Sequence, residues 1–482
     1  MNWTTYSLAW LLPAFSGSGI WLALSRGPRE RSDWLVALGA GWIVGLFLAG
    51  SLARWTGESD TQHAFAHAAI WLGAIGLLAW MIVIRLRFRS TGVGSGLALR
   101  EFSLGSLRKL PPWMTLVCLA LLALIVVRLW SVGSEALLRP AFPWDAWSAW
   151  SIKPKTWFLL GHAVPYVSMS EWLKQPDLAT HSLASWDYPE LLAWVELWFA
   201  SAAGAWNEPL IDIAWCGVLA ALLLAAYGQW RAIGMEPWRA LALTYALASL
   251  PLVDAHVALA GYADLWLAAT FGLAVLAWSR WLARREAGQW LLAIALALWL
   301  PAIKLEGAVW LLAFAMMVGF ERVPLRWRWR LVMALAVAAL VALFVGDLVL
   351  PLPGLGLVQV TWEGIRVPAI GSLDFSWHPV GRSMIASLFT LPNWHLLWYL
   401  IPVLVIWRWR RIREDPPACM LGALLALCAL LLLVLFFFTN AAAWAADYTS
   451  ANRLILQIVP VAFAFAGLLL RNRAGGIPDR LA

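Results

Sequence analysis

Ionisable side chains gather in a few short segments between long apolar runs, and these segments are the ones that could carry chemistry. Asp145 lies between Trp144 and Trp147, and Lys153 and Lys155 follow it closely. A carboxylate flanked by tryptophans is expected to be partly desolvated, which makes it a better proton acceptor. Indole rings also stack on the faces of sugars. The pattern favours Asp145 as a general base; the alternative is an interfacial aromatic belt with one solvated aspartate.

Two further aspartates precede apolar runs. Asp187 and Tyr188 stand directly before Pro189, which is expected to begin a helix, and Asp264 follows Gly261 and Tyr262. An aspartate at such a position can bind a substrate, or it can simply cap the helix by accepting a backbone N–H. The sequence leaves both interpretations open for Asp187 and for Asp264.

Two cations stand where apolar runs begin or end. Lys304 and Glu306 flank a tight turn before Gly307, and they could form a plain ion pair or bind a substrate. Arg453 opens the last apolar run. An arginine at the start of a helix opposes the helix dipole, and its predicted outer position opposes the usual bias of basic residues toward the cytoplasm. This conflict favours a phosphate-binding role for Arg453.

The elements that position these residues are predicted to be membrane helices. The chain has 482 residues, of which 62% are hydrophobic and 13% charged, with a mean hydropathy of +0.74. Soluble domains carry about 25% charged residues. Apolar runs long enough to cross a bilayer recur throughout, which predicts an all-α polytopic membrane protein with about thirteen transmembrane helices. They are expected at 4–24, 34–53, 67–84, 113–132, 211–230, 240–260, 265–282, 288–303, 307–320, 331–350, 391–407, 418–438 and 455–470.

The distribution of basic residues predicts the orientation. Most of the 35 Lys and Arg residues fall in alternate loops, among them clusters at 85–109, 322–330 and 408–413. Such loops face the cytoplasm, so we expect a periplasmic N-terminus and a cytoplasmic C-terminus in a bacterial inner membrane. The pI near 9.6 then follows from topology, and no nucleic-acid partner is indicated.

Two outer loops are long, at about 133–210 and 351–390. Within the first, the apolar stretch 188–206 is expected to form a juxtamembrane helix on the outer surface, because a further crossing would place the later arginine clusters outside. The Gly/Ser-rich stretch 91–106 is expected to be a cytoplasmic linker. The predicted division is an N-terminal extension at 1–110, a catalytic membrane module at 111–320 and a C-terminal membrane module at 321–482.

The ionisable groups crowd at the outer ends of the predicted helices rather than near the bilayer midplane. Ion-coupled transporters usually carry such groups at the midplane, whereas acids and bases at one face suit a reaction on a lipid headgroup. The four cysteines lie in apolar runs, which indicates no disulfide framework. The seven histidines show no metal-ligand spacing, so the use of a metal ion stays unknown.

At these residues the sequence resembles the bacterial membrane glycosyltransferases of the C-type fold (GT-C), and is similar to the protein O-mannosyltransferases and to the aminoarabinose transferases that modify lipid A. The resemblance covers roughly 113–320 and 447–460. It rests on an ordered series of features, namely Asp145 in the first large outer loop, Tyr188-Pro189 before a juxtamembrane helix, Asp264 at an outer turn, the Lys304-to-Gly307 turn, and Arg453 in the last helix.

The resemblance implies a glycosyltransferase with a polyprenyl-phosphate sugar donor and a lipid, glycan or protein acceptor. Asp145 would be the base, with Asp264 orienting the acceptor or a divalent metal ion. Lys153, Lys155, Lys304 and Arg453 would bind the donor phosphate, and Asp187, Tyr188 and Glu306 would complete the substrate site. The mannosyltransferases carry paired acids where this chain has Asp145 and Ala146. The alternatives are a transporter or flippase for a polyprenyl-linked glycan, and a non-catalytic membrane scaffold.

Overall fold

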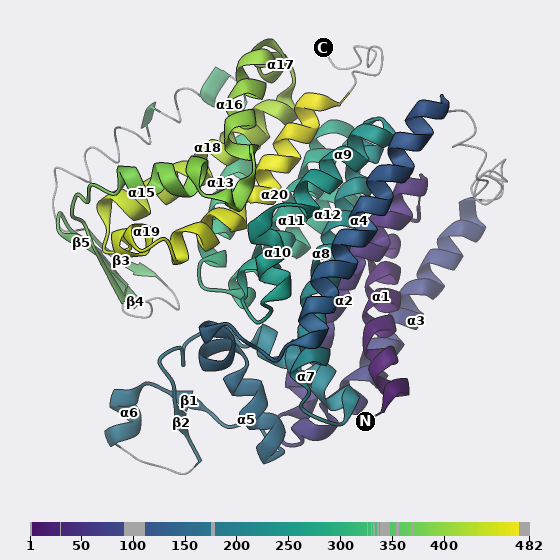
Figure 1. The fold of residues 1–482 in the computed structure, drawn as a ribbon, viewed down its shortest axis with the longest axis vertical. Coiled ribbons are helices and arrows are strands. Elements are labelled where there is room, and N and C mark those ends of the chain that lie inside the picture. The colour runs from purple at the N-terminus through teal and green to yellow at the C-terminus, as the bar shows by residue number, and fades with distance from the viewer. Residues whose placement is uncertain are drawn as a thin grey trace.

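A computed structural model describes residues 2–28, 30–90, 111–174, 179–324, 326–328, 330, 333–334, 337, 348–352, 356–367 and 371–471. Helices dominate these residues (Figure 1). In chain order the longer helices are α1 (Trp3–Leu24), α2 (Arg31–Gly57), α3 (Ala64–Ser90), α4 (Pro112–Leu138), α7 (Leu191–Ala203), α8 (Glu208–Ala232), α9 (Pro237–Ala248), α10 (Pro251–Ala258), α11 (Asp264–Arg284), α12 (Ala287–Ile303), α13 (Gly307–Arg322), α16 (Leu397–Trp407), α18 (Pro416–Phe438) and α20 (Ser450–Leu470).

Eight helices of the described residues are long and apolar enough to cross a membrane, and a ninth crossing results if the bent pair α9–α10 counts as one span. The eight are α1, α2, α3, α4, α8, α11, α18 and α20. The predicted spans at α12, α13 and α16 are helices of 17, 16 and 11 residues, shorter than the about 20 residues of a typical crossing. The span predicted at 331–350 and the linker at 91–106 lie mostly or wholly outside the described residues. A membrane protein is therefore supported, and the count of thirteen is not established.

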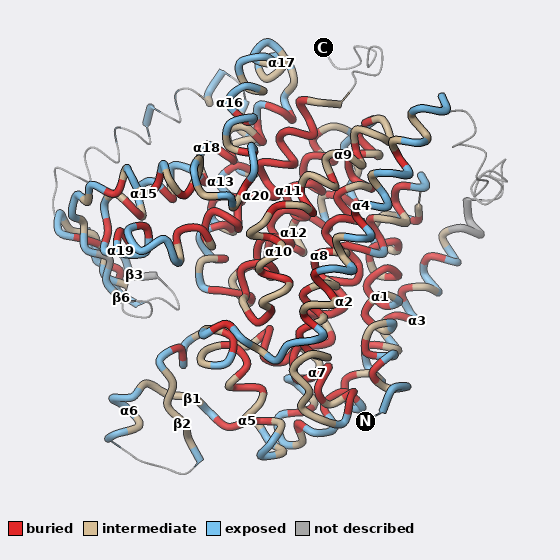
Figure 2. Tube along the Cα trace, viewed as in Figure 1, coloured by how far each residue is buried: buried red, intermediate tan, exposed pale blue. Residues whose placement is uncertain are grey.

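The hydropathy of a helix reflects where it lies in the bundle. Among the eight, α11 has the lowest mean hydropathy, 1.3, and is buried over its whole apolar window, whereas α18 has the highest, 3.0, and is only 33% buried. Figure 2 shows the buried helices α11 and α20 in the middle of the molecule. A helix surrounded by protein tolerates polar side chains, because protein groups rather than lipid meet them. This burial allows α11 to position a buried ionised group.

Tryptophans form a large part of the core. Among the described residues, ten tryptophans are at most 2% exposed, and Trp198, Trp215, Trp266 and Trp278 are among them. Trp215 meets Trp266 edge-on, with ring centroids 5.6 Å apart, between α8 and α11. Other tryptophans, such as Trp130 and Trp407, are exposed.

The first long loop folds into small elements at one end of the bundle, opposite α17 (Trp409–Glu414) (Figure 1). They are a π-helical turn (Ala146–Trp150), α5 (Ile152–Leu160), α6 (Met169–Lys174), and the parallel two-residue strands β1 (Tyr166–Val167) and β2 (His181–Ser182). Helix α7 follows. Its 13 residues span about 20 Å, too short for a crossing. Helix α7 is buried along nearly its whole length against α2, α1 and α3, so it does not lie exposed on the surface of the protein. Its juxtamembrane depth stays a prediction.

The second long loop contains a four-stranded antiparallel sheet that the sequence analysis did not predict. Its order is β3 (Leu348–Leu352), β4 (Gly356–Val360), β5 (Gly364–Val367) and β6 (Gly371–Asp374). Short helices α15 (Gly381–Ile385) and α19 (Ala442–Ala446) lie near it (Figure 1). Helices of the three predicted domains pack on one another, α2 on α8 and α20 on α11. The division of the chain into these domains stays a prediction.

Candidate functional site

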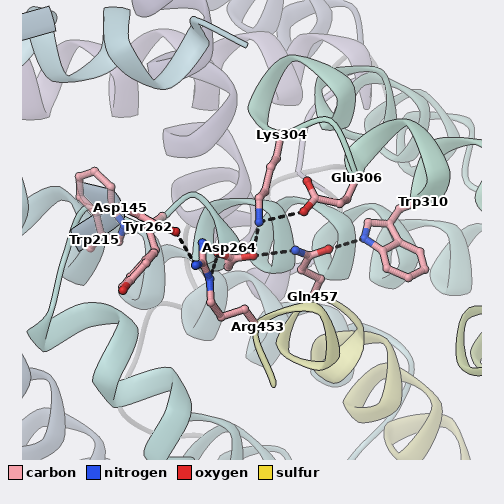
Figure 3. A network of polar contacts seen from close by, with 9 residues as sticks. All are labelled: Asp145, Trp215, Tyr262, Asp264, Lys304, Glu306, Trp310, Arg453 and Gln457. Atoms are coloured by element: carbon pink, nitrogen blue, oxygen red, sulfur yellow. Dashed lines mark hydrogen bonds and ion pairs between the residues drawn. The ribbon is translucent and has the colours of Figure 1, made fainter. Parts of the chain in front are cut away.

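Five segments far apart in the sequence meet in one polar network (Figure 3). They are the Asp145 loop, α8 with Trp215, residues 262–264 at the start of α11, residues 304–310 at the turn into α13, and residues 453–457 at the start of α20. The residues drawn are Asp145, Trp215, Tyr262, Asp264, Lys304, Glu306, Trp310, Arg453 and Gln457. Five of the nine sequence-predicted site residues belong to it, namely Asp145, Asp264, Lys304, Glu306 and Arg453.

Asp264 is the buried centre of the network. Its carboxylate is 0% exposed. Oδ1 accepts from Lys304 Nζ at 2.8 Å and from Gln457 Nε2 at 2.7 Å, and Oδ2 accepts from Arg453 Nε at 2.9 Å. The residue begins α11, but no capping hydrogen bond from its side chain is made there. The capping interpretation therefore does not explain Asp264, whose carboxylate instead holds two cations in place.

Arg453 joins the buried acid to a more accessible one. Its Nη1 donates to Asp145 Oδ2 at 2.5 Å while its Nε binds Asp264. Its guanidinium lies 4.3 Å from the centroid of the Tyr262 ring, a favourable cation–π contact. Arg453 is 17% exposed and Asp145 35% exposed, so this side of the network opens toward solvent. One guanidinium thus fixes the spacing of two carboxylates.

Lys304 and Glu306 form the ion pair that their sequence spacing allows, with Nζ and Oε1 3.0 Å apart. Lys304 also donates a hydrogen bond to Asp264, so its contacts are more than a plain ion pair with Glu306. Burial lowers the pKa of Lys304, but the carboxylates of Asp264 and Glu306 raise it, and the net pKa lies above the ordinary lysine value. Lys304 is therefore a fixed positive charge.

The Asp145 loop is held against the loop before α11 by two small residues. Gly261 has φ +105, which favours glycine, and a Cβ there would lie 2.3 Å from the Cβ of Ala146. Ala146 is fully buried. Trp215 Nε1 donates to the Tyr262 carbonyl at 2.7 Å and anchors the same loop. A second acid at position 146 would meet Gly261, which gives a physical reason for alanine beside Asp145.

The tryptophans around Asp145 do not enclose it as expected. Trp144 and Trp147 pack edge-on against each other with centroids 4.5 Å apart, and they are 69% and 46% exposed. Asp145 is held by Arg453 instead. The exposed indoles form a surface beside the network that could contact a sugar or the membrane.

The two loop lysines have structural partners away from Arg453. Lys153 is 3% exposed and donates to the carbonyls of Trp186 and Tyr188 at 2.7 and 3.1 Å. Burial lowers the pKa of Lys153, which Glu190 and Asp187 partly offset. Lys155 pairs with Glu208 at 2.8 Å, beside a separate cavity of about 490 Å³. These contacts hold the loop that follows Asp145. Neither lysine makes a described contact with the polar network around Asp264.

Tyr188 and Asp187 differ in their relation to the network. The Tyr188 phenol lies within electrostatic range of Lys304, Glu306, Asp145 and Arg453, and its ring centroid is 4.9 Å from that of Trp150. Burial raises its pKa. Asp187 is exposed and lies near Lys153. It does not cap α7, which begins at Leu191 after Glu190.

Gln457, Trp310 and the role of Tyr262 were not predicted from the sequence. Gln457 lies one helical turn after Arg453, and Trp310 Nε1 donates to its Oε1 at 2.6 Å. A polar residue four positions from Arg453 in an otherwise apolar helix lies on the same face, so this spacing could have identified Gln457. Nothing in the sequence marked Trp310 among so many tryptophans.

The network carries three carboxylates and two cations. Asp145, Asp264 and Glu306 oppose Lys304 and Arg453, so the ionised set has a net charge of −1. An anionic ligand would therefore add to an excess of negative charge unless it took the place of a carboxylate on one of the cations. Among the described residues no group of three or more His, Cys, Asp or Glu side chains is arranged to hold a metal ion.

No known protein family matches this sequence, and neither a curated protein nor a solved structure matches the chain.

Proposed function

We propose that this chain is a membrane glycosyltransferase that moves a sugar from a polyprenyl-phosphate donor to an acceptor at the periplasmic face of a bacterial inner membrane. The observation that carries the proposal is the bridging of Asp145 and Asp264 by Arg453, beside Lys304, at the ends of membrane-length helices. Two fixed cations next to an accessible carboxylate suit an anionic leaving group and an acceptor hydroxyl. The resemblance to GT-C transferases supports the same class.

Donor binding would exchange one anion for another at Arg453. The Arg453–Asp145 pair is partly exposed, and such pairs contribute about 1 kcal/mol or less. A phosphate accepts charge-assisted, two-point hydrogen bonds from a guanidinium. The donor phosphate would take the place of Asp145 on Nη1, while buried Asp264 would remain on Nε. Asp145 would then be a free carboxylate only when donor is present.

The reaction follows from this exchange. Asp145 accepts the proton of an acceptor hydroxyl as the hydroxyl oxygen attacks the anomeric carbon of the sugar. The bond between that carbon and the phosphate oxygen breaks, and its electron pair leaves with the phosphate. A phosphodiester with one negative charge becomes a polyprenyl phosphate with two, and Lys304 and Arg453 stabilise the added charge. A single displacement inverts the anomeric configuration.

In this proposal Asp264 is a positioning residue rather than one that contacts the reactants. All of its described hydrogen bonds go to Lys304, Arg453 and Gln457, and it is fully buried. It would hold both cations at a fixed separation. Tyr188 would line the donor site, and Lys153 would hold the loop that carries Tyr188. Lys155 and Asp187, which the sequence placed in the substrate site, would act only at its periphery.

The test is the Asp145→Asn substitution in purified, full-length protein. The assay supplies undecaprenyl phosphate carrying radiolabelled glucose, mannose or aminoarabinose together with a bacterial membrane extract as acceptor, and measures undecaprenyl phosphate release. Loss of the base should reduce release by about 10²- to 10⁴-fold. Asparagine has the same shape, so the thermal unfolding midpoint should change little.

The matched control is Glu135→Gln near the C-terminal end of α4, the helix that precedes Asp145 in the sequence. It removes one partly exposed charge, which pairs with Arg139 at 3.0 Å. Its rate should equal that of the original protein. A normal rate in Asp145→Asn would remove Asp145 from the mechanism. If the unmodified protein releases no undecaprenyl phosphate from any of the three donors, the assignment as a transferase for these sugars fails.

A second function, transport of a polyprenyl-linked glycan, is favoured by one observation. Arg128 lies ten residues before the end of α4, about 15 Å inside the helix. It pairs with Asp254 on α10, which follows a 60° break after α9. Broken helices with embedded charges are typical of transporters. Proteoliposomes with a labelled undecaprenyl-phosphate glycan separate the two functions, because transfer releases undecaprenyl phosphate and transport moves intact lipid.

A further inference from the structure

A second cationic region lies at the other end of the molecule from the network. Among the described residues, a cavity of about 890 Å³ is lined by the arginines Arg408, Arg410, Arg411 and Arg471 and by one acid, Glu414. Asp415 binds Arg471 at 2.7 and 2.9 Å. Even with both acids counted, the charge of this group is +2. Its side chains come from α17, the residues before it and the end of α20.

The cavity differs from the network because its positive charge is in excess. Arg410 is exposed, and the Arg408 guanidinium lies 3.8 Å from the centroid of the Trp407 ring. Within the described part of the chain, Arg408 Nε is buried without a hydrogen-bond partner. A buried cationic donor that the protein leaves unsatisfied is costly unless an anion or water meets it. The arrangement therefore suits an anionic ligand.

The remaining lining residues show that one side of the cavity is apolar. Ile406, Trp407 and Trp409 line it and are 78%, 62% and 55% exposed. Upstream on α16, Leu400 and Val403 are also exposed and, with Trp407, follow the i, i+3, i+7 spacing of one helix face. An apolar stripe thus leads from the cavity along α16. A soluble anion would leave this stripe uncovered, whereas a lipid acyl chain would cover it.

The positions of Arg453 and Arg471 along α20 indicate at which surface of the bilayer the cavity lies. Arg453 lies near the start of α20 and Arg471 directly follows its end. Eighteen residues of helix separate them by about 27 Å, close to the thickness of a hydrocarbon core. Figure 1 shows α17 at the opposite end from α5 and α6. The cavity would therefore lie at the other bilayer surface, the one that the basic residues assign to the cytoplasm.

We propose that this cavity binds the headgroup of an anionic phospholipid, with the arginines on its phosphodiester and an acyl chain along the exposed face of α16. Basic pockets at the cytoplasmic ends of membrane helices are suited to such headgroups. The tryptophans occupy the interfacial depth where a headgroup lies. The site does not depend on the proposed transferase activity.

The experiment uses the full chain, purified in neutral detergent and depleted of lipid. Native mass spectrometry measures binding of phosphatidylglycerol, phosphatidylcholine and inorganic phosphate to the original protein and to the double variant Arg408→Gln/Arg410→Gln. We expect phosphatidylglycerol to bind the original protein and to bind the double variant at least tenfold more weakly. The control Arg26→Gln/Arg85→Gln removes two exposed arginines outside the cavity and should bind as the original does.

Three results would overturn the proposal. Equal binding of phosphatidylglycerol by the double variant and the control would show that the cavity is not the site. Equal binding of phosphatidylcholine would show nonspecific lipid association. Binding of inorganic phosphate with displacement of the lipid would show a soluble-anion site instead.

A measurement on the original protein covers the case in which the double variant fails to fold. Phosphatidylglycerol with a photoreactive group in its acyl chain should crosslink to α16, within the peptide 397–407. Crosslinks confined to other helices, such as α4 or α18, would contradict the proposal.

Discussion

Arg453 contributes geometry as well as charge, because two of its nitrogens bind different acids. Nε binds the buried Asp264 and Nη1 binds the accessible Asp145. A lysine presents a single ammonium and cannot reproduce this fork. We expect Arg453→Lys to lower the transfer rate by about 10²- to 10³-fold, because removal of one fixed hydrogen-bond donor to a developing negative oxygen has an effect of that size.

Kinetics with the donor concentration varied would check this prediction. The control is Arg139→Lys, because Arg139 is an exposed arginine whose ion pair among the described residues is with Glu135. The control should leave KM and kcat unchanged. Unchanged KM and kcat in Arg453→Lys would mean that the fork has no part in donor binding.

Lys304 makes stability depend on pH in the alkaline range. Its pKa is raised above 10.5 by Asp264 and Glu306 in the folded protein. A raised lysine pKa stabilises the fold fully below the unfolded-state value, and this stabilisation is lost as pH rises through the folded-state value. The thermal unfolding midpoint in detergent should therefore fall above about pH 10.5. The fall should be smaller in Lys304→Met, and an identical pH profile in the variant would contradict the linkage.

At the scale of elements, the close contact of α11 with α20 brings Asp264 to Arg453. A Cβ on Gly272 would lie 2.2 Å from the Cβ of Pro460. Gly272 is eight residues after Asp264, and Pro460 is seven after Arg453, so the two contacts lie about two turns apart on helices that run in the same direction. Helices can approach this closely only where a small residue lies between them.

We therefore expect Gly272→Val to push α20 away from α11 and to disturb the network two turns away. Overpacking of this kind costs about 1–3 kcal/mol, and the thermal unfolding midpoint would measure it. Gly319→Val is the control, because a Cβ at Gly319 in α13 meets nothing within 4 Å. It adds the same side chain to a helix without a clash. Equal midpoints for the two variants would contradict the packing argument.

At the scale of the whole molecule, the α17 end and the α5–α6 end lie on opposite sides of the bundle (Figure 1). The basic residues predict that the α17 end is cytoplasmic. In a variant with the four native cysteines replaced by alanine, Ser170→Cys on α6 should react with a membrane-impermeant maleimide applied to cells with a permeabilised outer membrane. Arg413→Cys on α17 should react only after lysis.

Both positions are exposed in the structure, so poor access to the side chain would not explain a negative result. Reaction of Arg413→Cys in intact cells would reverse the predicted orientation. It would also move the proposed transferase site to the cytoplasmic side.

The sequence by itself determined the class of the protein and most of the members of the network. Long apolar runs require helices in a membrane, since every backbone polar group must be satisfied without water. The charged residues stood out because so few occur between these runs. Asp145, Asp264, Lys304, Glu306 and Arg453 could be selected for this reason. Their functional roles, and the GT-C resemblance, stay predictions.

Tertiary structure decided which of those charges meet. Lys153 and Arg453 are both cations beside apolar segments, yet Lys153 binds loop carbonyls and Arg453 binds two acids. The difference depends on the packing of α11 against α20 and of Ala146 against Gly261, which no local pattern encodes. Burial of α7, the β3–β6 sheet and the position of Arg128 within α4 likewise depend on neighbours far away in the sequence. Local periodicity specifies helices, whereas the contacts between them arise only when the whole chain packs.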